Sequence, residues 1–312
     1  MNIKIPQHAY VTLPLATIPP GWSYREAFSR NLGLVNPAEQ ERLRNSRVAV
    51  VGLGGVGGID LVTLARLGIN RFTIADPDIF EMANTNRQFG AMQSTMQQPK
   101  AEVMAKIVRD INPEADIRIF REHIGSHNAE QFLKDADIMA DGIDAFEIEV
   151  RRILFRQAAR QGIYALGAGP VGFSTAWVIF DPKGMSFDDY FGLSDGMGAI
   201  EQFAAYIVGM VPKATQRVYM NISEIDFDAH RGPSVGAACE LAAGVLTAEV
   251  AKILLKRGVR RCAPHYYQFD PYVGRFIHGR LITGGKYHPL QRLKRWWLIQ
   301  YLRSRQIASP PK

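Results

Sequence analysis

The sequence predicts an α/β fold: a Rossmann-like, doubly wound and mostly parallel sheet with helices on both faces. A glycine-rich turn follows an apolar run, and further apolar runs of strand length alternate with segments of helical periodicity. The 312 residues are 47% apolar and 21% charged, which is typical of a globular protein and excludes a disordered chain. With only two cysteines, the chain alone cannot build a disulfide framework or a four-cysteine zinc site.

The first βαβ unit is the strongest pattern in the chain. Val48 to Val51 and Phe72 to Ala75 are expected to be buried strands, and Ile59 to Leu67 has helical spacing. The same alternation predicts strands at 117–120 and 138–140 and helices at 101–111, 129–133, 147–160, 199–210 and 237–255. The weaker stretch 184–198, GMSFDDYFGLSDGMG, is interpreted as a loop.

Two segments outside this alternation also carry signals. Pro37 suits the first turn of a helix that includes Glu39 to Arg44, with Asn36 as its cap, whereas the proline-punctuated residues 1–20 are expected to be extended. The uncharged stretch from Gln161 to Phe180 is long enough to span a bilayer. Its four glycines and one proline favour two buried strands joined by a turn instead.

The net charge of +7 is unevenly distributed along the chain. Residues 1–259 hold 26 Lys and Arg against 29 Asp and Glu, whereas residues 260–312 hold 11 against 1. The basic character therefore belongs to the C-terminal segment and does not by itself indicate a nucleic-acid-binding body.

Gly52, Gly54 and Gly57 form the pattern G-x-G-x-x-G between a strand and a helix. Their lack of side chains lets the backbone turn sharply and approach a phosphate at the helix N-terminus. Asp76 ends the next strand, where a carboxylate can accept hydrogen bonds from a ribose. On these residues alone, an NAD-dependent Rossmann enzyme is an open alternative.

The residues that follow narrow this choice. DPDIFEMANTNRQ spans 76–88, Lys100 lies thirteen residues after Arg87, and Asp144, in DGID, lies forty-four after Lys100. This joint spacing resembles the ThiF/MoeB/HesA adenylyltransferase family, which shares its catalytic fold with ubiquitin-activating enzymes. The resemblance covers residues 24–180 and 231–257. The local sequence also looks like the tRNA threonylcarbamoyladenosine dehydratase branch of that superfamily.

The resemblance implies a nucleotidyltransferase that uses ATP and Mg²⁺ to activate a carboxylate as an acyl-adenylate. It implies that Arg87 and Lys100 contact the phosphates, that Asp76 contacts the ribose, and that Asp144 binds Mg²⁺ and acts with Arg87 and Lys100 in catalysis. It also implies that Arg30 reaches the phosphates of a partner subunit, so a homodimer is expected. The further nucleotide-binding residues that it implies are Gly52, Gly54, Gly55, Gly57, Asp78, Asn84 and Gln88. Asp78 and Asp141 are equally well explained as supports of the loop and of the strand end.

The chain departs from the family in its cysteines. Many relatives carry a cysteine in the crossover region and paired C-x-x-C motifs, and this chain has neither. Cys239 lies in an apolar helical segment and is expected to be buried, and Cys262 follows two arginines outside the expected region. The seven histidines show no metal-ligand spacing. A cysteine relay is therefore not expected.

Three functions stay open on the sequence. The leading one is activation of a peptide or ubiquitin-like C-terminus, or of a small acid, without a cysteine relay. The second is a cyclising enzyme like the threonylcarbamoyladenosine dehydratases, and the third is a nucleotide-binding scaffold without turnover. The retained Arg30, Arg87, Lys100 and Asp144 argue against the scaffold.

The expected organisation has three parts. Residues 1–46 form an N-terminal arm and helix that carry Arg30, residues 47–259 form the adenylation domain with a variable crossover near 182–233, and residues 260–312 form a basic tail. The N-terminal residues lack the unbroken apolar stretch of a secretory signal, so a cytoplasmic location is expected, with a peripheral membrane location as an alternative.

The tail segment HPLQRLKRWWLIQYLRSR has the pattern of a basic amphipathic helix. Leu290, Leu293, Trp297 and Tyr301 fall on one side at helical spacing, and Arg292, Arg295 and Arg303 lie on a neighbouring face. Three occupants are open for the apolar side: the protein's own core through Trp296 or Trp297, an anionic membrane, or tRNA.

Overall fold

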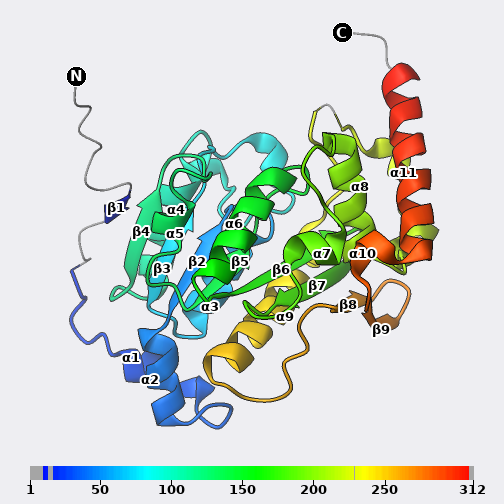
Figure 1. The fold of residues 1–312 in the computed structure, drawn as a ribbon. Coiled ribbons are helices and arrows are strands. Elements are labelled where there is room, and N and C mark those ends of the chain that lie inside the picture. The colour runs from blue at the N-terminus through cyan, green and yellow to red at the C-terminus, as the bar shows by residue number, and fades with distance from the viewer. Residues whose placement is uncertain (1–9, 13–16, 228, 309–312) are drawn as a thin grey trace, which may run out of the picture. The chain divides into compact units, whose positions relative to one another are not determined.

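The computed structural model describes residues 10–12, 17–227 and 229–308 (Figure 1), and the chain divides into two compact units. The first unit comprises Met1–Ile143 and Ala243–Arg260, and the second comprises Asp144–Ala242 and Arg261–Lys312. Most of the extended arm predicted for residues 1–20 lies outside the described residues.

A parallel sheet forms the centre of the first unit. Its strands β2 (Arg47–Val51), β3 (Arg71–Ala75), β4 (Asp116–Phe120) and β5 (Ile138–Asp141) lie in the spatial order β4-β3-β2-β5. This order is that of one half of a Rossmann fold, and the short β1 (Val11–Thr12) adds to β4 in antiparallel orientation. All five residues of β2 are buried, as an apolar central strand requires.

Helices flank this sheet, so the predicted α/β class is confirmed. The helices of the first unit are α1 (Tyr24–Ala27), α2 (Pro37–Asn45), α3 (Gly57–Arg66), α4 (Lys100–Ile111) and α5 (Ala129–Phe132), with short 3₁₀ turns η1 (Ser29–Asn31), η2 (Met82–Asn84) and η3 (Gln93–Thr95). The predicted cap of α2 is confirmed: the Asn36 side chain accepts from the Glu39 N–H, and the Glu39 carboxylate accepts from the Asn36 N–H.

The second unit contains an antiparallel sheet in the order β6-β7-β8-β9. Its strands are β6 (Tyr164–Val171), β7 (Ser174–Phe180), β8 (His265–Asp270) and β9 (Arg275–Arg280). Its helices are α6 (Ile148–Arg160), α7 (Phe187–Phe191), α8 (Ala199–Met210), α10 (Gly284–Tyr287) and α11 (Pro289–Ala308), with η4 (Thr215–Val218) and η5 (Ile222–Glu224). Helix α9 (Gly236–Leu254) runs across the boundary between the units. The predicted strand pair within 161–180 is confirmed by β6 and β7.

Two expectations need correction, and a third is extended. The stretch 184–198 is not all loop, because Ser186 caps the short helix α7. The amphipathic helix expected in the basic tail is present as α11, and the tail also holds the strands β8 and β9 before that helix. Neither Trp296 nor Trp297 is buried, since these side chains are 59% and 42% exposed, so α11 docks through other residues.

Candidate nucleotide site

The glycine-rich turn is closed by backbone contacts that exclude side chains. Gly52 has a φ of 76°, and a Cβ there would lie 2.5 Å from the carbonyl oxygen of Gly142. A Cβ on Gly57 would lie 1.9 Å from the carbonyl oxygen of Gly52. Helix α3 therefore starts directly against the turn, and its N-terminal N–H groups lie where an anion would be stabilised.

Asp76 fastens this turn to the end of β3. Its Oδ2 accepts a hydrogen bond from the Leu53 N–H at 2.6 Å, and its Oδ1 accepts one from the Asp78 N–H at 2.9 Å. Burial raises the pKa of Asp76, and the Lys100 ammonium and the two N–H donors partly oppose that effect. Each carboxylate oxygen has a second lone pair, so Asp76 retains capacity for a ribose hydroxyl.

Lys100 is the most unusual charge in this region. It is the first residue of α4 and only 6% exposed, although a cation at a helix N-terminus opposes the helix dipole. The Lys100 Nζ lies 3.1 Å from Oδ2 of Asp78, and the backbone N–H of Lys100 donates to the backbone carbonyl of Asp78. A buried ammonium in this position is stabilised by nearby anions, and Asp78 supplies one of them.

The segment after β3 places Gln88 beside the glycine-rich turn. A Cβ on Gly54 would lie 3.5 Å from Nε2 of Gln88, and Oε1 of Gln88 is buried without a hydrogen-bond partner among the described residues. Asn84 instead accepts from the Glu81 N–H and so supports η2. Arg87 donates to the Ala83 carbonyl and to Oδ1 of Asn86.

Arg30 and Asp144 occupy different positions from this group. Arg30 is exposed in η1 and has no hydrogen-bond or ion-pair partner within the described ranges. Asp144 begins the second unit, is exposed, and accepts from the Phe146 N–H at 3.0 Å. The first unit thus brings together the glycine-rich turn, Asp76, Asp78, Gln88 and Lys100.

An aromatic stack follows Asp144 in the second unit. The Phe146 ring is stacked between Phe203 at 4.8 Å and His230 at 5.1 Å, and Phe227 meets it edge-on. Phe203 in α8, Phe227 and His230 all belong to the predicted crossover segment. Within the second unit, their contacts with Phe146 attach this segment to the residues directly after Asp144.

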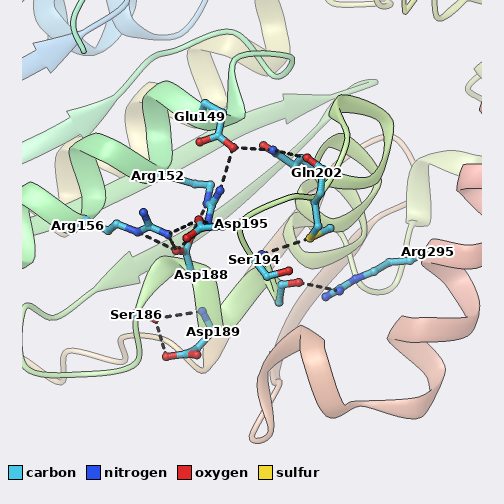
Figure 2. A network of polar contacts seen from close by, with 12 residues as sticks. Glu149, Arg152, Arg156, Ser186, Asp188, Asp189, Ser194, Asp195, Gln202 and Arg295 are labelled. Carbon is cyan, nitrogen blue, oxygen red and sulfur yellow. Dashed lines mark hydrogen bonds and ion pairs between the residues drawn. The ribbon is translucent and has the colours of Figure 1, made fainter. Parts of the chain in front are cut away.

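A charged network holds α6 in the second unit (Figure 2). Arg152 is 2% exposed and contacts Glu149, Asp188 and Asp195 at 2.9, 3.0 and 2.7 Å. Arg156 pairs with the same two aspartates. All of these groups are satisfied by one another, so the network is structural.

Sequence reasoning missed two features of the turn. Gly142 is required by the close approach of Gly52 and Gly57, and its signal was a glycine directly after a strand. Asp60, in the first turn of α3, is fully buried, and neither of its carboxylate oxygens has a hydrogen-bond partner among the described residues. Cys239 is buried, as predicted.

Comparison with known proteins agrees with this geometry. The sequence pattern described as the ThiF family matches residues 28–283. The chain is 40% identical over 105 residues to tRNA threonylcarbamoyladenosine dehydratase of Bacillus subtilis (strain 168), covering 34% of this chain and 41% of the relative. It is 36% identical over 107 residues to a probable molybdopterin-synthase adenylyltransferase of Porphyra purpurea, covering 34% and 28%. The matches thus span less than half of the length of either relative.

A solved structure extends the likeness to most of the chain. The crystal structure of E. coli MccB with MccA superposes with a TM-score of 0.65 and 18% identity, covering 84% of this chain and 73% of that one. At this identity the likeness shows a shared fold.

Proposed function

The chain belongs to the ThiF family, and we propose that it activates a carboxylate with ATP. The carboxylate oxygen attacks the α-phosphorus of ATP, an O–P bond forms, the bond to the bridging oxygen breaks, and pyrophosphate leaves. The products are an acyl-adenylate and pyrophosphate.

The buried Lys100 is the observation that carries this proposal. Hydride transfer to or from NAD does not need a desolvated ammonium at a phosphate-binding turn, whereas displacement of pyrophosphate needs charge neutralisation. Lys100 and Arg87 would bind the phosphates, and Asp76 would bind the ribose. The glycine-rich turn and Gln88 would contact the nucleotide along one side. Oε1 of Gln88, which has no hydrogen-bond partner among the described residues, and the lack of a side chain at Gly54 fit a bound nucleotide.

Asp144 is proposed to hold the Mg²⁺ that accompanies ATP. Oδ1 of Asp144 accepts the hydrogen bond from the Phe146 N–H, and Oδ2 is the carboxylate oxygen proposed to bind the cation. A hard cation such as Mg²⁺ prefers oxygen ligands of this kind. Bound Mg²⁺ would neutralise charge on the departing pyrophosphate. Arg30, exposed in η1, is proposed to reach the site of a second copy in a homodimer.

The acyl substrate is proposed to be a peptide, a protein C-terminus or a small acid, and no cysteine relay is proposed. A second candidate is cyclisation of threonylcarbamoyladenosine in tRNA, which is favoured by the identity to the Bacillus subtilis dehydratase.

ATP–pyrophosphate exchange separates these candidates. Exchange with peptides alone supports the first, and exchange or dehydration with modified tRNA alone supports the second. The control is Lys100→Met, which should lose exchange while retaining a cooperative unfolding transition. Mg²⁺-dependent ATP binding without exchange against any acid would indicate a scaffold, and tight NAD binding without ATP binding would refute the assignment.

A further inference from the structure

Helix α11 has one covered side, and the opposite side is apolar and exposed. It packs along α8 in the second unit (Figure 1), with Gln291 and Leu302 buried at 3% and 4% exposure. Arg295 on the same side donates to the carbonyl oxygens of Phe191 and Gly192. This side holds the helix on its own unit.

The opposite side carries large apolar groups in contact with solvent. Leu290, Leu293, Trp296 and Trp297 are 60%, 61%, 59% and 42% exposed, and at 3.6 residues per turn they fall on one stripe. Tyr287, just before the helix, is 67% exposed. We call these five residues the exposed stripe. Contiguous exposed apolar groups of this size indicate an interaction surface.

Cations border the exposed stripe. Lys294 donates to the Pro212 carbonyl at 2.6 Å, and its pKa is lowered by burial and by the nearby Lys213 and Arg217. The Arg217 guanidinium lies 5.0 Å from the Trp297 ring centroid, and Arg292 is exposed on the helix. Residues 271–312 contain no Asp or Glu. A partner that is both anionic and apolar would complement this surface.

We propose that the exposed stripe inserts into the interface of an anionic lipid bilayer, with α11 lying in the membrane plane. Leucine and tryptophan side chains bury among acyl chains and headgroups, while Lys213, Arg217 and Arg292 attract acidic headgroups. A lipid surface satisfies both properties at once. RNA offers no acyl-like environment for Leu290 and Leu293, and a symmetric contact between two copies would bring like charges together.

Co-sedimentation of the full chain with vesicles tests this proposal. We expect binding to vesicles of 70% phosphatidylcholine and 30% phosphatidylglycerol, little binding to pure phosphatidylcholine, and loss of binding as salt is raised. The double variant Leu293→Ser, Trp296→Ser should bind at least tenfold more weakly. The matched control, Leu34→Ser, Val259→Ser, removes two apolar groups that are 79% and 70% exposed and should bind like the unaltered chain.

A second variant tests the charges without touching the stripe. Lys213→Gln, Arg292→Gln should weaken binding to anionic vesicles about fivefold or more at low salt, and circular dichroism melts check the fold of every variant. The proposal is overturned if the unaltered chain does not co-sediment with anionic vesicles at low salt. It is likewise overturned if the stripe variant and the control variant bind these vesicles with equal affinity. It is also overturned if the stripe variant loses only self-association in sedimentation velocity, or only a gel shift with tRNA.

Discussion

Asp60 is a buried side chain whose ionisation is expected to lower the free energy of unfolding. It is fully buried in the first turn of α3, and neither oxygen has a hydrogen-bond partner in the described part of the chain. Burial raises its pKa well above the usual value, and the Asp141 carboxylate adds to that effect. The folded state therefore holds a proton that the unfolded chain releases near pH 4.

This difference predicts a pH dependence of stability. Because the folded state binds more protons, the free energy of unfolding should fall as pH rises from about 4 to the folded pKa, by up to about 1.4 kcal/mol per pH unit. Asp60→Asn cannot ionise and should lack this component. Urea unfolding at four pH values between 5 and 8 measures it, with the exposed Asp110→Asn as control. Parallel curves for the unaltered chain and Asp60→Asn would contradict the prediction.

At the scale of elements, the charged network of Figure 2 joins α6 to α7 and to the turn that precedes α8. Arg152→Met leaves Asp188 and Asp195 paired with Arg156, and leaves Glu149 with the hydrogen bond that Gln202 donates. We expect a loss of about 1.5 kcal/mol in the free energy of unfolding, because Asp188, whose side chain is 18% exposed, keeps its desolvation cost with one cation fewer, whereas Glu149 and Asp195 are solvated at 58% and 86% side-chain exposure.

Denaturant unfolding checks the effect of Arg152→Met. Arg160→Met, on the exposed side of the same helix, should change stability by about 0.5 kcal/mol or less. Arg152→Lys should lie between the two, because an ammonium cannot reach three acids as the guanidinium does. Equal stability of the two methionine variants would mean that the network adds nothing.

The same elements show what periodicity could predict. The buried strands β2 to β5 and the helices between them are read from local apolar spacing, since both faces of a parallel strand are covered. Helix α7 was missed because its five residues are too few for a helical period. Strands β8 and β9 were missed because each alternates apolar with polar and basic residues inside a segment dominated by its charge.

The functional features also divide into those that sequence spacing can predict and those that only the packing reveals. The glycine-rich turn, Asp76 and Lys100 could be predicted as candidates because their spacing along the chain is local or characteristic. Outside the site, the two aspartates that pair with Arg152 lie 36 and 43 residues away in sequence, and no local pattern marks them. The missing partners of Asp60 are likewise a property of packing, which only the folded structure reveals.

At the scale of the whole molecule, the proposal that no cysteine relay operates is testable. Cys239 is buried in α9, and Cys262 is half-buried before β8. The double variant Cys239→Ala, Cys262→Ala should keep both pyrophosphate exchange and overall turnover, at a cost of about 1 kcal/mol in stability for the buried thiol. Retained exchange with lost turnover would reveal a covalent intermediate.

The proposed homodimer has a consequence that a monomer cannot reproduce. Arg30→Ala and Asp144→Ala should each abolish exchange on their own. If Arg30 acts on the partner's site, a mixed dimer pairs an intact Asp144 from one subunit with an intact Arg30 from the other, and so restores one of its two sites. With random subunit exchange, half of the dimers are mixed, and about a quarter of the sites regain activity.

The measurement mixes the two purified variants, one carrying a mass tag, and follows exchange activity alongside native mass spectrometry. If Arg30 acts within its own subunit, every site in a mixed dimer lacks one of the two residues, and no activity returns. Mixing either variant with itself is the control and should stay inactive. Confirmed subunit exchange without restored activity would therefore refute a shared site, because the two arrangements differ only in which subunit supplies Arg30.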